Sequence, residues 1–158
     1  MKKRRKKIHL AKVLWSPLNK FNYVQYRQTC RILNQIGEDF DMYNLPLVIY
    51  KDKVNADMEG LHTAVNSMHK IQVPNDAYYI YNLAEAFGYL QMYRTGEIRL
   101  FSERGIEMTA KGYAAAFCKR MADTESFMQM LPPDVLEDGE ISLELGQYIE
   151  HMEEYYEM

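Results

Sequence analysis

The chain has 158 residues, 47% of them hydrophobic, and a formal net charge of -3 at pH 7. A chain of this length can bury one ordinary core, which favours a single folded domain with short extensions. No apolar run approaches the roughly 18 to 20 residues that cross a bilayer, so we expect a cytoplasmic protein without a membrane span or signal peptide.

Positive charge is concentrated at the start of the chain, where residues 1–37 hold ten Lys or Arg residues and no acid. Residues 1–7 repel one another too strongly to pack, which predicts a disordered basic arm. Such an arm binds polyanions by releasing counterions from phosphates. A nuclear import signal, an anchor to anionic lipid and a solubilising tail are the alternative interpretations. The predicted nucleic-acid-binding residues of this region are Lys2, Lys3, Arg4, Arg5, Lys6, Lys7 and Lys12.

Helical and strand patterns follow the basic arm. Ser16 before Pro17 predicts the start of a helix that ends at Gly37. The apolar run 45–50 predicts a short strand, and the spacing of apolar residues over 58–71 predicts a second helix.

A third helix is predicted from Asn75 or Asp76 to about Arg94, and Gly96 favours a left-handed cap after it. One face of this helix is aliphatic and its opposite face is rich in tyrosine. A helix that is apolar all round is normally buried on both sides. The tyrosine face is therefore either covered by another element, such as the acidic last helix, or exposed to bind a partner. Its residues are Tyr78, Tyr81, Tyr89 and Tyr93.

Residues 97–108 alternate around Gly105, which predicts a β-hairpin, and Thr109 is predicted to begin a fourth helix. This order of elements, with the segment GIEMTAKG at 105–112, resembles bacterial winged helix-turn-helix regulators over residues 17–122. The resemblance implies an α+β, mostly helical, winged-helix-like domain with a small β-hairpin. The third helix holds few basic residues, so a DNA duplex would be held by the arm and by Arg99 and Arg104 on the hairpin, or the domain binds protein.

Negative charge is concentrated at the other end. Residues 132–158 hold nine acids and no Lys or Arg. Pro132 and Pro133 separate this extension from the domain at 8–131, and Ser142 is predicted to begin its single helix. An acidic, aromatic surface can imitate nucleic acid, although a solvated cap of the domain is the simpler interpretation. The predicted partner-binding residues are Glu144, Glu150, Glu153 and Glu154.

No pattern of catalytic residues is visible. The chain has no phosphate-binding loop and no serine in a nucleophile elbow. His62 and His69 are too far apart to share a metal ion, and Cys30 and Cys118 have no motif partner, so they are expected to be free thiols. We therefore expect no enzymatic activity, no cofactor and no metal.

These patterns lead to a functional hypothesis in three forms. The first is a non-enzymatic regulatory protein that binds nucleic acid or a nucleoprotein complex, such as a DNA-binding regulator of a mobile element or phage. The alternative is a protein inhibitor of a nucleic-acid-handling enzyme, acting through protein contacts and charge mimicry. The third is a structural adaptor that forms a homo-oligomer through the tyrosine face.

Overall fold

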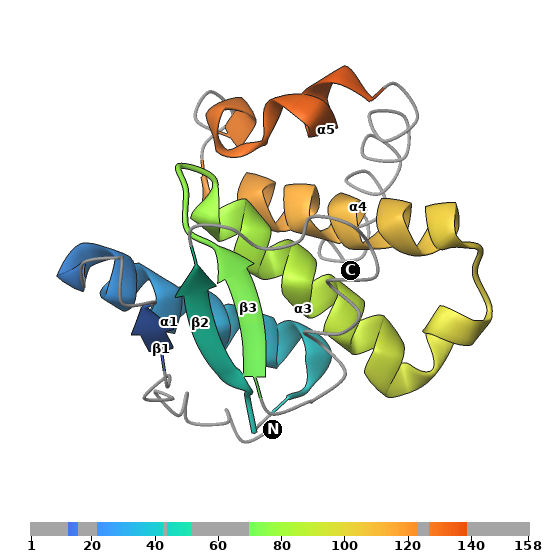
Figure 1. Ribbon diagram of the computed structural model, residues 1–158, viewed down its shortest axis with the longest axis horizontal. Coiled ribbons are helices and arrows are strands. Elements are labelled where there is room, and N and C mark those ends of the chain that lie inside the picture. The colour runs from blue at the N-terminus through green and yellow to red at the C-terminus, as the bar shows by residue number, and fades with distance from the viewer. Residues whose placement is uncertain (1–12, 16–21, 43, 52–69, 123–126, 139–158) are drawn as a thin grey trace, which may run out of the picture.

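The computed structural model of the protein describes residues 13–15, 22–42, 44–51, 70–122 and 127–138. These residues form a mixed domain that is mostly helical and contains a small sheet, which confirms the coarse prediction of fold class (Figure 1). In chain order the elements are β1 (Val13–Trp15), α1 (Tyr23–Phe40), β2 (Leu47–Lys51), β3 (Lys70–Pro74), α3 (Tyr79–Thr95), η1 (Glu97–Arg99), α4 (Glu103–Met121), η2 (Phe127–Met130) and α5 (Pro133–Glu137).

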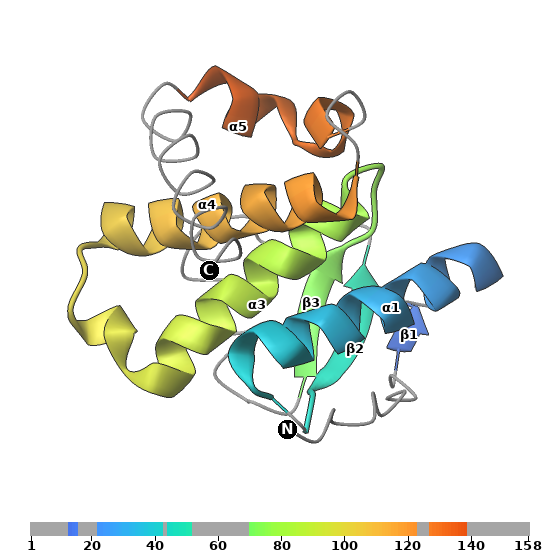
Figure 2. The same ribbon diagram turned by 180° about the vertical axis from the view of Figure 1, so that it is seen from behind.

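The three strands form a parallel sheet in the order β1-β2-β3. Figure 2 shows α1 and α3 in front of the sheet, and both lie behind it in Figure 1, so the two helices cover the same face. Alternate strand residues point to this face and are buried or half-buried, namely Val13, Trp15, Val48, Tyr50, Ile71 and Val73.

The strand predicted at 45–50 is confirmed as β2, but the pattern gave no sign of β1. The predicted second helix is wrong at Ile71, which lies in β3, and residues 58–69 of that prediction lie outside the described residues. The prediction included Ile71 because its spacing continues the helical pattern of the residues before it. In the structure Ile71 pairs with Val48 of β2.

Helix α1 passes through Gly37 and ends at Phe40, so the predicted stop at Gly37 is wrong. Asp41 is the residue in the left-handed conformation, with φ 53°. The chain then turns back over the helix, and a Cβ on Gly37 would lie 2.9 Å from the carbonyl oxygen of Met42. Glycine is therefore required at position 37 by the close approach of two backbone segments.

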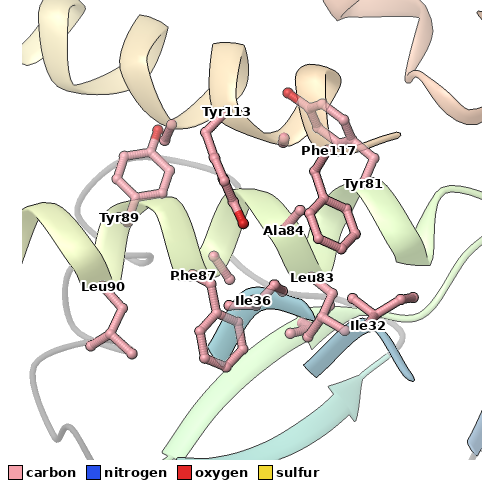
Figure 3. Close-up of a cluster of buried hydrophobic side chains, with 14 of the residues drawn as sticks. Ile32, Ile36, Tyr81, Leu83, Ala84, Phe87, Tyr89, Leu90, Tyr113 and Phe117 are labelled. Carbon is pink, nitrogen blue, oxygen red and sulfur yellow. The ribbon is translucent and has the colours of Figure 1, made fainter. Parts of the chain in front are cut away.

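Helix α3 is the central element and is buried on both sides (Figure 3). Leu83 and Phe87 point toward the sheet and α1, whereas Tyr81 and Tyr89 point toward α4. The α3 and α4 backbones come close at Gly88, where a Cβ would lie 3.2 Å from the Cα of Ala110. The predicted third helix and its cap at Gly96 are confirmed, but the predicted start is wrong, because the helix begins at Tyr79 and its N-cap is Tyr78, not Asn75 or Asp76.

The predicted β-hairpin at 97–108 is wrong, because these residues form η1 and the start of α4. The Ser102 side chain accepts a hydrogen bond from the Gly105 N–H over 3.1 Å, which caps a helix that begins at Glu103 instead of Thr109. The order of elements that resembles a winged helix depended on that hairpin. The resemblance is not confirmed.

The chain returns to the core after α4. Leu131 and Val135 are 2% exposed, and both belong to the main hydrophobic cluster. The helix predicted from Ser142 onward and the basic arm at 1–7 lie outside the described residues. None of the helices in the described ranges is long and apolar enough to span a membrane.

Candidate nucleic-acid interface

Helix α1 presents a basic and aromatic face to solvent. Its core-facing residues include Ile32, Leu33 and Ile36, which are at most 1% exposed. The opposite side carries residues whose spacing of three or four keeps them together on one surface. We call Tyr23, Val24, Arg27 and Arg31 the α1 stripe, and all four are exposed.

The first turn of α1 combines several features that attract anions. Asn22 caps the helix by accepting a hydrogen bond from the Gln25 N–H over 3.1 Å. The turn holds no acid, so none of its own side chains offsets the positive end of the helix dipole. Tyr23 is 63% exposed and Val24 is 68% exposed, so two neighbouring apolar side chains lie on the surface at the helix start.

The arginines of the α1 stripe have no acidic partner among the residues that the structure describes. Arg27 lies over the ring of Tyr23, with its Cζ 6.0 Å from the ring centroid. Neither Arg27 nor Arg31 forms an ion pair within the described part of the chain. Both guanidinium groups are therefore available to an external anion.

Several other cations of the domain are engaged internally. Lys111 contacts Glu107 over 3.2 Å and Asp134 over 3.8 Å. Arg120 donates to Asp39, and Arg94 donates to the carbonyl of Phe40. The α1 stripe differs from these residues because its charges are not used to hold the fold together.

The core side of α1 is fixed by polar contacts as well as by packing. Gln25 Nε2 donates to Asn75 Oδ1 over 2.9 Å, which links α1 to the turn after β3. Thr29 Oγ1 and Tyr50 Oη lie 2.7 Å apart, and burial raises the pKa of Tyr50 to about 12. These contacts set the rotation of α1, so the stripe faces away from the sheet.

Of the residues predicted to bind nucleic acid, Arg99 and Arg104 lie within the described ranges. Arg99 is exposed at the end of η1, which is far from the first turns of α1 along the long axis in both views (Figures 1 and 2). Arg104 contacts Glu107 over 3.1 Å and Asp138 over 2.6 Å, so its charge is largely neutralised. The structure does not bring these two residues together with the α1 stripe. The basic residues 2–7 and Lys12 lie outside the described residues.

The tyrosine face is covered by α4. Tyr81 and Tyr89 are 1% and 2% exposed, and Figure 3 shows both pointing toward that helix. Tyr78 is half-buried and Tyr93 is 37% exposed. The four tyrosines therefore do not form a continuous open surface. The predicted partner-binding residues Glu144, Glu150, Glu153 and Glu154 lie outside the described residues.

A cluster of charged groups joins α3, α4 and α5. Burial raises the pKa of Glu85, and Lys111 opposes this effect. Tyr81 and Tyr89 also have raised pKa values, because both hydroxyl groups are buried and lie near the Glu85 carboxylate. No group of three potential metal ligands occurs within the described ranges. We interpret the cluster as an internal contact between helices.

Sequence reasoning missed the α1 stripe as a site. Arg27 and Arg31 belong to the acid-free block 1–37, but the composition does not show which of its residues face solvent. The spacing of Tyr23, Arg27 and Arg31, four residues apart, is the signal that could have found it.

Comparisons with family models, with curated proteins and with solved structures give no match for this chain.

Proposed function

We propose that this chain is a regulatory protein that binds nucleic acid, either free or within a nucleoprotein complex, and that the α1 stripe contacts the phosphate backbone. The observation that carries the proposal is the pair of exposed arginines, Arg27 and Arg31, which have no acidic partner among the described residues. Arginine forms two parallel hydrogen bonds to a phosphate, and such contacts supply most of the affinity in non-specific binding.

The position of the stripe supports the proposal. The basic residues of the arm precede β1 and α1 in sequence, so they extend the same acid-free block. Acids of α1 are confined to its last turn, at Glu38 and Asp39. A polyanion that approaches the first turns of α1 therefore meets no negative charge from that part of the helix.

Salt-dependent binding tests the proposal. Fluorescence anisotropy of the full chain with labelled duplex DNA, single-stranded DNA and duplex RNA should show binding that weakens steeply with salt concentration. Each arginine that contacts a phosphate of duplex DNA contributes about 0.9 to the slope of log K against log salt concentration. Arg27→Gln and Arg31→Gln should each reduce the slope by about that amount.

Arg99→Gln is the matched control, because it removes the same charge from an exposed residue at a distant surface. It should leave the slope almost unchanged. Equal losses for all three variants would show that net charge, and not the α1 stripe, determines binding. Absence of binding to every probe even at low salt would refute the proposal.

A further inference from the structure

We infer that the nucleic acid is duplex DNA and that the first three turns of α1 enter its major groove. This inference rests on the proposed function and adds the class of nucleic acid and the manner in which it is contacted.

The shape of the site indicates that the helix enters a groove of the nucleic acid, and not that the nucleic acid enters a groove of the protein. In both views the first turns of α1 extend past β1, which is an edge strand of the sheet (Figures 1 and 2). A helix with its side chains is about 10–12 Å across, and the major groove of B-form DNA is about 12 Å wide. A projecting helix of this kind can therefore enter the major groove.

The same shape disfavours single strands and RNA helices. Proteins that bind single strands line a concave groove with several aromatic rings on which bases stack. The α1 stripe lies along one side of a single helix, and Tyr23 is its single aromatic residue. The major groove of an RNA helix is too narrow and deep for side chains to read.

The order of side chains along α1 matches the requirements of a helix that reads bases. In such helices the first residues contact base edges, and residues further along contact the backbone. Val24, in the first turn, suits apolar contact with a thymine methyl group. Arg27, which contacts a phosphate on DNA of arbitrary sequence, can donate two hydrogen bonds to a guanine at a preferred site. Arg31 lies about 6 Å further along the axis and suits a phosphate.

The ends of the helix set its direction in the complex. The first turn of α1 has no acid, whereas Glu38 is exposed near the last turn and Asp41 follows the helix. The positive end of the helix dipole therefore points toward the DNA and the acidic end lies furthest from it.

Binding to three matched probes separates this inference from the proposed function. The full chain should bind duplex DNA at least about tenfold more tightly than single-stranded DNA or duplex RNA of the same sequence. Equal affinity for a single strand or for duplex RNA would overturn the inference and leave the proposed function standing. No binding to any probe would refute both.

Groove and base contacts are tested by selection from a pool of randomised DNA duplexes. Selection should enrich a short motif that contains guanine, and 7-deazaguanine in that motif should weaken binding by about tenfold because it removes a major-groove acceptor. Arg27→Lys should keep the salt slope but lose the preference for guanine, since lysine retains the charge without the two-pronged geometry. Failure to enrich any motif, or unchanged affinity for the 7-deazaguanine duplex, would overturn the inference.

Discussion

Gly37 is structurally required, as its glycine identity suggested, but it does not end the helix as the sequence pattern predicted. Ala in place of Gly in a helix interior normally stabilises a protein by about 1 kcal/mol. At position 37 the added Cβ would meet the Met42 carbonyl oxygen at 2.9 Å, which is too close for either backbone segment to accommodate freely.

We therefore expect Gly37→Ala to lower the free energy of unfolding by about 1–3 kcal/mol. Urea unfolding followed by circular dichroism measures the change. Gln28→Ala in the same helix is the control and should alter stability by less than about 0.5 kcal/mol. A more stable Gly37→Ala variant would show that the chain can move away at Met42 without cost.

Glu85 gives a second prediction at the scale of one residue. Desolvation raises its pKa, and the groups that face it are Tyr81 of α3, Glu107 and Lys111 of α4, and Asp134 of α5. The native state therefore binds more protons than the unfolded state at pH values between the two pKa values. The contribution of Glu85 to stability is greatest below the unfolded pKa and is lost as the pH rises through the folded pKa.

Glu85→Gln should consequently raise the melting temperature relative to the wild type at pH values above the folded pKa, where the wild-type carboxylate carries a charge in a desolvated site. The difference should shrink as the pH falls to the unfolded pKa of about 4.3. Thermal unfolding of both proteins between pH 4 and pH 8 at constant ionic strength provides the measurement. A difference that does not change with pH would mean that the charge of Glu85 costs nothing in the fold.

At the scale of elements, Asp39 holds the end of α1 against α4. Its carboxylate accepts hydrogen bonds from Tyr113 Oη over 2.9 Å, from Gln35 Nε2 over 3.0 Å and from Arg120. The Asp39 side chain is 7% exposed and that of Arg120 is 24% exposed, so the pair is partly shielded from solvent.

We expect Asp39→Asn to cost about 2–3 kcal/mol of stability, because it leaves the Arg120 guanidinium without a countercharge. A double-mutant cycle with Arg120→Met should give a coupling energy of about 1–3 kcal/mol. Additive losses, with a coupling energy near zero, would show that the two side chains stabilise the fold independently.

The elements that could be predicted are those with both a periodic pattern and a terminal signal. Helix α3 has aliphatic residues at helical spacing on one face and tyrosines on the other, and it ends at Thr95 before Gly96, which adopts φ 83° as a left-handed cap requires. The prediction of a hairpin failed because Ile106 and Met108 alternate with Glu107 as in a strand. The four-residue spacing from Ile106 to Ala110 fits a helix equally well. Ser102 decided between the two patterns, since its hydrogen bond to Gly105 begins a helix.

Sheet topology could not be predicted, because its strands are too short to show a period. β1 has three residues, and its pairing with β2 joins segments more than thirty residues apart in sequence. The candidate site was predictable in part. The acid-free block indicated binding to a polyanion, but only packing shows that Arg27 and Arg31 face solvent while Arg104 is paired with Glu107 and Asp138.

At the scale of the whole molecule, the separation of basic residues at the start of the chain from acidic residues at its end is partly kept in the folded structure. The first turns of α1 extend past the β1 edge of the sheet, while several acids of the described residues gather where α4 meets α5. If the α1 stripe binds nucleic acid, the acidic end of the chain should weaken that binding by long-range repulsion and not by competing for the same contacts.

Neutralising four acids of the C-terminal extension tests this expectation in the full chain. The variant Glu144→Gln, Glu150→Gln, Glu153→Gln, Glu154→Gln changes the formal net charge from -3 to +1, since four negative charges are removed. Its affinity for duplex DNA should rise several-fold at low salt, and the gain should fall as salt shortens the screening length to about 8 Å at physiological ionic strength. Anisotropy titrations at several salt concentrations measure both effects. A loss of affinity would instead place these glutamates in a contact that supports binding, and a gain that persists at high salt would indicate that the acidic end occupies the α1 stripe directly.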